Sequence, residues 1–192
     1  MSNLQGTQTE KNLLKAFAGE SQARNRYTYA AEVARAEGFP QIAALFLETA
    51  DNERAHAKRF FDFLERGGPV EITASYPAGK IGTTAENLRA AAQGEEEEWS
   101  SLYPAFAEVA RAEGFSDVAA AFNLIAKVEK EHEARFRKLL ENVEQHKVFS
   151  KDEPTEWKCE NCGYVHEGKQ APKKCPACLA EQSEFSVRAK NY

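Results

Sequence analysis

The sequence contains no apolar run of about 20 residues, the length that a membrane-spanning helix needs. Its beginning, MSNLQGTQTEKNLLKAF, lacks the basic and then apolar pattern of a signal peptide. Positive charge is not in excess either, since 25 basic residues against 30 acidic ones give a net charge of −5. We therefore expect a cytoplasmic protein that has neither a membrane nor a nucleic acid as its partner.

Cysteine is absent from the long first part of the chain and then occurs four times, at positions 159, 162, 175 and 178. Disulfides are rare in the cytoplasm, so two C-x-x-C pairs indicate a metal site. A G-x-G-x-x-G motif after a strand is missing as well. Any oxidation of NADH would therefore have to take place on a separate protein.

Helix breakers are few up to about residue 147, where Ala, Glu, Leu and Arg dominate, and the 42% of hydrophobic residues can form a substantial core. A stretch rich in Gly, Pro and Thr at 67–84 predicts a long connection. From about residue 154 the chain is short of helix formers, which predicts a bundle domain at 1–150 and a small second domain at 151–192. The predicted helices span 8–37, 40–66, 84–113 and 116–146.

The first half of the chain is repeated in the second half. The octapeptide EVARAEGF occurs at 32–39 and again at 108–115, an offset of 76 residues. Two related helical hairpins joined by a long crossover predict an all-α, ferritin-like four-helix bundle. The same offset relates Tyr27 to Tyr103, Phe46 to Phe122, Glu53 to Glu129 and His56 to His132.

The apolar stripe of the second predicted helix is interrupted by a glutamate and a histidine. The fourth helix repeats this stepping, with Glu129 and His132 between its apolar residues. A single E-x-x-H could be an ordinary surface pair. Two pairs related by the repeat, both on buried stripes where an unpaired charge is costly, indicate a site instead. The stripe of the second predicted helix consists of Ile42, Phe46, Thr49, Glu53, His56, Phe60 and Phe63.

The other two helices each add carboxylates to this interior. Glu20 lies on the stripe of the first helix, although a salt bridge to Arg24 or Arg26 is the alternative. On the third helix the run GEEEEW places Glu95 and Glu98 on the stripe. The two glutamates between them, at 96 and 97, fall on the flanks and are predicted to be solvated.

One conflict concerns the register of the third helix. The offset of 76 pairs Glu20 with Glu96, whereas the apolar stripe selects Glu95. A one-residue π-bulge between Glu95 and Tyr103 would reconcile the two, and such bulges are frequent at functional sites. We follow the stripe, because burial acts on each residue directly.

One glutamate from each of two helices plus E-x-x-H from the other two is the pattern of di-iron carboxylate proteins. Carboxylates with a few imidazoles suit iron or manganese better than zinc or copper. Tyr27 and Tyr103 would lie nearby, either to orient a substrate or buffer radicals, or as packed core phenols. The predicted metal ligands are Glu20, Glu53, His56, Glu95, Glu98, Glu129 and His132.

The tail carries a second metal motif, C-x2-C-x12-C-x2-C. Two such knuckles could hold zinc in a ribbon or iron in a rubredoxin-type centre, and the spacing alone does not decide between them. The aromatic residues Trp157, Tyr164 and Phe185 favour the rubredoxin-type centre, as does fusion to a redox-capable bundle. The predicted ligands are Cys159, Cys162, Cys175 and Cys178.

Along essentially its whole length the chain resembles the rubrerythrin family. The resemblance is carried by AGESQARNRY, ADNERAHAKRF, GEEEEW, KEHEARF and WKCENCGYVHEGKQAPKKCPAC. It implies a rubredoxin-like C-terminal domain and three iron ions per subunit, one di-iron centre and one Fe(Cys)4. It also implies that the seven interior residues hold the di-iron centre, where Glu98 and His56 serve the same iron in different redox states.

The activity that this resemblance implies is a peroxidase of oxidative stress defence, which reduces hydrogen peroxide to water. Electrons would come from a rubredoxin or a flavoprotein reductase that uses NAD(P)H, and the protein would be a homodimer. The alternative is a ferroxidase or an iron-binding ferritin-like protein. A storage protein has no need of an attached electron-transfer domain, so the cysteine tail weighs against that alternative.

Overall fold

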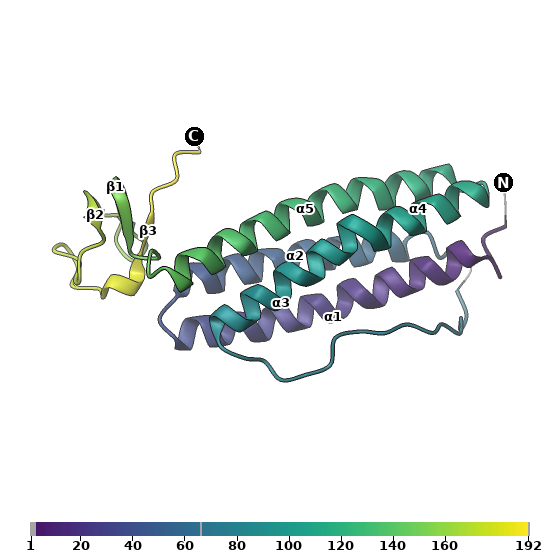
Figure 1. Ribbon diagram of the computed structural model, residues 1–192, viewed down its shortest axis with the longest axis horizontal. Helices are drawn as coiled ribbons and strands as arrows, with labels where there is room; N and C mark the ends of the chain where they lie inside the picture. The colour runs from purple at the N-terminus through teal and green to yellow at the C-terminus, as the bar shows by residue number, and fades with distance from the viewer. Residues whose placement is uncertain (1–2, 66, 192) are drawn as a thin grey trace.

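The computed structural model describes residues 3–65 and 67–191 and contains two helical hairpins followed by a small sheet (Figure 1). The second hairpin starts only after a long crossover, so α2 and α3 run in the same direction, as in ferritin-like bundles. The predicted fold class is confirmed. The helical elements are α1 (Gln8–Ala36), α2 (Pro40–Phe61), α3 (Thr84–Glu97), the π-helical segment η1 (Glu98–Leu102), α4 (Tyr103–Ala112) and α5 (Ser116–Glu144).

Local sequence signals start these helices. The Thr7 side chain accepts a hydrogen bond from the backbone of Glu10 and so caps α1. Thr83 and Glu86 form a reciprocal capping box at the start of α3. Pro40 stands in the first turn of α2, where its missing N–H costs nothing.

The prediction that the second helix continues to residue 66 is wrong, because α2 ends at Phe61. The chain turns there, with the backbone N–H of Phe63 and Leu64 bonding back to the carbonyls three residues earlier. Both side chains still pack against the adjacent apolar core, and the positive φ of Gly67 and Gly68 then turns the chain into the crossover. Residue 66 itself lies outside the described residues.

The predicted π-bulge is confirmed. The five residues Glu98–Leu102 form a π-helix between α3 and α4. This segment lies between Glu95 and Tyr103, where the bulge was predicted. Glu95, which precedes it, stands 75 residues after Glu20, whereas Tyr103 stands 76 residues after Tyr27. A single inserted residue therefore accounts for both offsets.

The core consists of two apolar clusters at opposite ends of the bundle, each with an aromatic trio. In one cluster Phe136 lies 5.3 Å from Tyr27 and 5.2 Å from Phe46, measured between ring centroids. In the other, the repeat-related trio places Phe60 5.5 Å from Tyr103 and 4.9 Å from Phe122. On α2 and α5, which carry residues of both trios, the E-x-x-H pairs lie between them in sequence.

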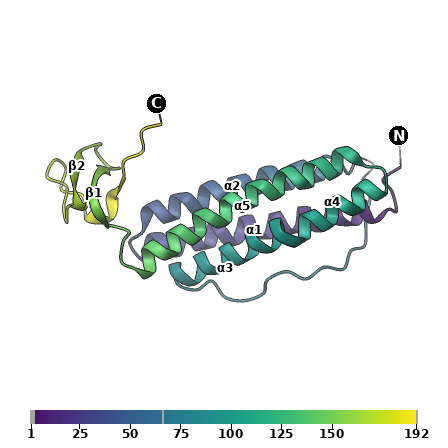
Figure 2. The same ribbon diagram turned by 45° about the horizontal axis from the view of Figure 1, so that its top comes forward.

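The crossover between α2 and α3 runs along the outside of the bundle over its whole length (Figure 2). Tyr76 attaches it to α1 by donating a hydrogen bond from its hydroxyl to the Lys15 carbonyl at 2.8 Å. The ring of Tyr76 also packs beside Gly19, 3.8 Å from where a Cβ would stand.

After α5 the chain forms an antiparallel sheet of order β2-β1-β3 at the end of the bundle opposite to the N-terminus (Figure 1). Phe149, just before this sheet, stacks on Phe39 of the bundle with ring centroids 6.2 Å apart. The division into domains at 1–150 and 151–192 stays a prediction. The strands are β1 (Ser150–Cys159), β2 (Val165–Gln170) and β3 (Phe185–Val187).

Within the described part of the chain, each helix is too short or too polar to span a lipid bilayer.

Each hairpin supplies a carboxylate to the start of the other hairpin. Glu113, after α4, accepts hydrogen bonds from the backbone N–H of Gln8 and Thr9 and from the Thr9 hydroxyl, the last at 2.6 Å. Glu37, its counterpart after α1, accepts one from the backbone N–H of Thr84 at 3.0 Å. These contacts join the two hairpins at both ends of the bundle. Each carboxylate lies at a helix N-terminus, where the helix dipole stabilises its negative charge.

Replacement of Glu113 by glutamine should lower the free energy of unfolding at pH 7 by about 1 kcal/mol, the usual value of a helix cap. The hydrogen bonds from Thr9 lower the pKa of Glu113. A carboxyl whose folded-state pKa is lowered stabilises the protein above its unfolded-state pKa, and this contribution is lost as the pH falls. Urea unfolding should therefore show the difference at pH 7 and a smaller one below about pH 4.

The matched control is Glu108→Gln, because this exposed residue of α4 forms only a surface pair with Arg111. It should change stability by less than about 0.5 kcal/mol at either pH. A Glu113 variant that is as stable as the wild type at pH 7 would contradict the capping role.

Candidate metal centres

The four long helical elements bring six of the seven predicted ligands into two groups at mid-bundle. Within each group the ligand atoms lie within 4.8 Å of one another. Glu53 and Glu129 belong to both groups, so they stand between two potential metal positions. The first group is Glu20, Glu53, His56 and Glu129, and the second is Glu53, Glu95, Glu129 and His132.

The imidazoles and carboxylates face one another closely. The Nδ1 atom of His56 lies 2.9 Å from Glu129 Oε1 and 3.0 Å from Glu53 Oε2. The Nδ1 atom of His132 lies 2.8 Å from Glu129 Oε2 and 3.2 Å from Glu53 Oε1. Donor atoms about 2.1 Å from one metal ion, at right angles to each other, are about 3 Å apart, so these distances fit ligands of a common ion.

Hydrogen bonding does not satisfy this cluster. Among the described residues, His132 Nδ1, Glu53 Oε1 and both carboxylate oxygens of Glu129 are buried without a hydrogen bond. His132 Nδ1 lies 2.8 Å from Glu129 Oε2, yet neither atom makes a hydrogen bond. Buried polar atoms that converge without bonding are costly unless a further atom binds them, and a metal ion would do so.

Burial makes the charge of this cluster hard to sustain. At most 1% of the surface of Glu20, Glu53, Glu95 and Glu129 is exposed. Burial, followed by repulsion from neighbouring carboxylates, raises the pKa of Glu20 and of Glu95 well above the usual value. Cations between the carboxylates would remove both penalties.

The histidines compensate part of this charge. Burial alone would lower the pKa of His56, but the neighbouring carboxylates of Glu129 and Glu53 raise it to about 10. The same two partners raise the pKa of His132 to about 9 against the effect of burial. Both rings would therefore be protonated in the metal-free cluster, and metal binding must displace these protons.

Two tyrosines hold the outer carboxylates in place across the pseudo-twofold axis. The Tyr27 hydroxyl donates to Glu95 Oε1, and the Tyr103 hydroxyl donates to Glu20 Oε1, both at 2.5 Å. Burial, and then the charge of Glu95, raises the pKa of Tyr27 well above the usual value. Burial, and then the charge of Glu20, raises the pKa of Tyr103 in the same way. Both phenols therefore stay protonated and act as hydrogen-bond donors to the cluster.

Glu98 lies beside the two groups without belonging to either. It is partly exposed, and it is the first residue of η1. Burial, followed by the charges of Glu129 and Glu53, raises its pKa well above the usual value, which places it within electrostatic reach of both shared carboxylates.

The two remaining glutamates of the GEEEEW run are exposed, as predicted. Glu96 pairs with Arg137 at 2.7 Å. Arg137 also contacts Glu133, which accepts a hydrogen bond from the Trp99 indole at 2.6 Å. The four-residue spacing of Glu133 and Arg137 is the one sequence signal for this network, which was not predicted. The network joins η1 to α5.

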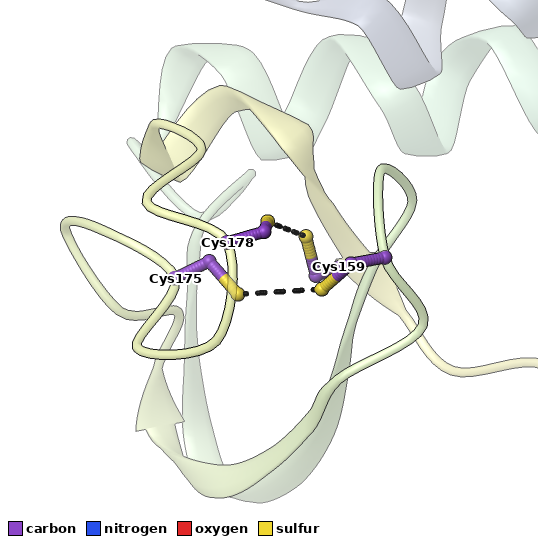
Figure 3. Close-up of side chains that lie close together, drawn as sticks. Cys159, Cys175 and Cys178 are labelled. Carbon is purple, nitrogen blue, oxygen red and sulfur yellow. Dashed lines mark hydrogen bonds between the residues drawn. The ribbon is translucent and has the colours of Figure 1, made fainter.

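The four cysteine sulfurs form a second, separate group (Figure 3). The Sγ atoms of Cys159 and Cys178 are 3.8 Å apart, and those of Cys162 and Cys175 are 3.6 Å apart. Disulfide sulfurs would be about 2.05 Å apart. Sulfurs bound about 2.3 Å from one tetrahedral metal are about 3.8 Å apart, which is the spacing observed.

The backbone around these cysteines is folded for metal binding as well. After each knuckle a residue adopts a positive φ, 81° at Gly163 and 64° at Leu179. The Asn161 side chain donates to the Cys178 sulfur at 3.3 Å, and this hydrogen bond lowers the pKa of the Cys178 thiol to about 6. Thiolate is the form that binds metals. Trp157 and Phe185 are buried beneath the sulfurs, in the small core of this domain.

Comparison with known proteins agrees with this geometry. Residues 11–140 match the rubrerythrin family, and residues 157–186 match the rubredoxin-like domain of rubrerythrin. The chain belongs to the rubrerythrin family. It is therefore a di-iron protein with a rubredoxin-like domain, and its cofactors are one di-iron centre and one Fe(Cys)4 centre.

Individual rubrerythrins are similar along the whole chain. The rubrerythrin of Porphyromonas gingivalis is 60% identical over 190 residues, which cover 99% of this chain and 94% of the relative. The rubrerythrin of Nitratidesulfovibrio vulgaris is 50% identical over 192 residues, with complete coverage of both. The solved structure of fully reduced, all-ferrous nigerythrin superposes with a TM-score of 0.64 at 30% identity, covering 96% of this chain and 91% of nigerythrin.

Glutamine variants of the GEEEEW run should separate site carboxylates from surface carboxylates in this member of the rubrerythrin family. Glu95→Gln and Glu98→Gln should lower the iron bound at the di-iron centre, since each removes a negative charge at the cluster. Glu96→Gln and Glu97→Gln are the matched controls, and they should retain full iron and change stability by less than about 0.5 kcal/mol. Iron content per chain would be measured for all four variants. Loss of iron in Glu96→Gln would contradict the register given by η1.

Proposed function

We propose that this protein is a peroxidase that reduces hydrogen peroxide to water at the di-iron centre. Electrons would pass one at a time through the Fe(Cys)4 centre from an external NAD(P)H-dependent reductase, by way of a flavoprotein or a rubredoxin. The reaction consumes two electrons and two protons for each peroxide and releases two water molecules. The observation that carries the proposal is the joint presence, in one chain, of the carboxylate–histidine cluster and the four-sulfur group.

We further propose that the ligands of the di-iron centre are the seven residues predicted from the sequence. The unbonded, buried oxygens and the 2.8–3.2 Å contacts between imidazole and carboxylate support the six residues of the two groups. The seventh, Glu98, is supported by its place at the partly exposed edge of the cluster. A reduced di-iron pair supplies the electrons and the Lewis acidity that break the O–O bond.

The chain's own residues would prepare the centre for this reaction. Tyr27 and Tyr103 fix the orientation of Glu95 and Glu20 through their hydrogen bonds. The two aromatic trios keep water away from both ends of the cluster, which strengthens the electrostatic interactions within it. Peroxide and protons would arrive from the side of Glu98, because this carboxylate is partly exposed while the four others are buried.

A homodimer would complete the electron path. The rubredoxin-like domain lies at the very end of the bundle (Figure 1). The carboxylate–histidine cluster is formed by residues well inside α1, α2 and α5, away from the bundle ends. A second copy that runs in the opposite direction and is shifted along the bundle axis would bring its own sulfur group alongside the cluster. We also propose that the protein acts in the cytoplasm, in defence against oxidative stress.

The competing function is a ferroxidase that acts with dioxygen. Steady-state NADH consumption, with a reductase supplied in excess, would distinguish the two. We expect hydrogen peroxide to be consumed much faster than dioxygen. The di-iron centre can supply the two electrons that one peroxide needs, and the Fe(Cys)4 centre can then return electrons to it one at a time. Dioxygen turnover equal to or faster than peroxide turnover would assign the protein as an oxidase or ferroxidase.

Removal of the rubredoxin-like domain should abolish turnover but leave the first reduction of peroxide intact. A chain that ends at Lys151 retains all seven proposed ligands and the stacking of Phe149 on Phe39. Pre-reduced truncated protein should react once with peroxide, observed by stopped-flow absorbance, and should then fail to turn over with reductase and NADH. Circular dichroism checks that the bundle is intact, and normal turnover by a folded, truncated chain would refute the relay.

A further inference from the structure

A pocket of about 260 Å³ opens beside the carboxylate–histidine cluster, between α1, α3, η1 and the crossover. Glu98 lies on its wall, together with the rings of Tyr27 and Tyr103. Tyr76 of the crossover forms part of the wall at the α1 side and is anchored there by its bond to the Lys15 carbonyl. The pocket therefore connects the partly exposed edge of the cluster with the surface beneath the crossover.

Two glycines inside helices contribute to the walls of this pocket, Gly19 on α1 and Gly94 on α3. They stand 75 residues apart, so they are equivalent in the two halves of the repeat, and they directly precede Glu20 and Glu95. Glycine destabilises a helix interior relative to alanine. Its presence at both equivalent positions therefore calls for a physical reason.

Neither backbone conformation nor packing supplies that reason. A Cβ added at Gly94 would meet no atom within 4 Å, and one added at Gly19 would meet only the Tyr76 ring, at 3.8 Å. Neither residue has the positive φ that favours glycine, in contrast to Gly38 and Gly114 in the turns between helices. What the two glycines provide is empty space next to the cluster.

The chemistry of the pocket selects a small, neutral molecule. Its wall carries two basic residues, Lys15 and Arg26, and two acidic residues, Glu97 and Glu98, so neither sign of charge is in excess. The remaining wall includes apolar side chains such as Leu102. The hydroxyls of the two wall tyrosines already donate to cluster carboxylates. Glu97, Gln22, Ser75 and Glu98 remain as acceptors for a ligand O–H, and of these Glu98 lies beside the cluster.

The size of the pocket exceeds the need of hydrogen peroxide. A water molecule occupies about 30 Å³ in the liquid, and hydrogen peroxide is only slightly larger. The pocket of about 260 Å³ therefore has room for an alkyl group attached to the peroxide.

We propose that this pocket binds hydroperoxides, ROOH, with a small alkyl group R as well as hydrogen peroxide, and that Gly19 and Gly94 keep it open. This inference rests on the peroxidase function proposed above. The O–O bond of ROOH breaks, two electrons arrive from the external reductase through the Fe(Cys)4 centre, and two protons complete ROH and water. Glu98 accepts the hydrogen bond of the ROO–H group, while the alkyl group lies along the apolar wall.

The test is to fill the pocket in the full-length holoprotein with Gly94→Leu. We expect kcat/KM for tert-butyl hydroperoxide to fall by about tenfold or more, as for other steric changes in binding pockets, with a clearly smaller loss for hydrogen peroxide. Gly94→Ala should give an intermediate loss. The matched control is Gln93→Leu, which adds the same side chain at the exposed neighbouring position and should leave both values unchanged.

Thermal unfolding checks that the Gly94 variants fold, and their midpoints should not fall, because alanine and leucine are better helix formers than glycine. Equal losses for the two peroxides, no loss for either, or a wild type that turns over hydrogen peroxide but not tert-butyl hydroperoxide would each overturn the proposal.

A second measurement is independent of turnover. Crystals of the wild type soaked with tert-butanol, the product alcohol, should show it between Gly19 and Gly94, and crystals of Gly94→Leu should not. If the wild type reduces neither peroxide but binds the alcohol there, the peroxidase function fails and the pocket stands as a site for small neutral molecules. An empty wild-type pocket would refute the site itself.

Discussion

The structure depends on the burial of like charges. Four carboxylates that are almost completely removed from solvent would repel one another and destabilise the bundle unless cations lie between them. The helices α1, α2, α3 and α5 each contribute one or more groups to this arrangement, and the two shared carboxylates, Glu53 and Glu129, come from different hairpins. The iron ions that the rubrerythrin family binds therefore also join the two hairpins, so that metal binding and folding are coupled.

The pseudo-twofold repeat explains how this site is constructed. Each hairpin supplies an E-x-x-H, a further glutamate and a tyrosine, but the tyrosine of one hairpin bonds the glutamate of the other. The same exchange occurs at the bundle ends, where Glu37 and Glu113 each bond the start of the opposite hairpin. The second hairpin departs from symmetry at η1, where one additional residue coincides with one additional carboxylate, Glu98.

Access to the cluster follows from the same asymmetry. The aromatic trios close both ends of the cluster, and Glu98 marks the side that is open to a pocket. Glycines stand at two equivalent helix positions on the walls of that pocket, where they make the helices less stable than alanine would. The crossover, held to α1 by Tyr76, then covers the pocket that these glycines leave free.

The sequence by itself determined the four helices, the crossover, the two metal motifs and the register of the GEEEEW run, because burial and helical periodicity act on each residue locally. The π-bulge followed from comparing that register with the repeat. Only the tertiary structure decided which groups meet. The bonds from Tyr27 to Glu95 and from Tyr103 to Glu20 join residues 68 and 83 positions apart, and periodicity carries no information about such partners. The early end of α2, the position of Glu98 outside both groups and the space beside Gly19 and Gly94 likewise depend on packing between hairpins, which no local pattern encodes.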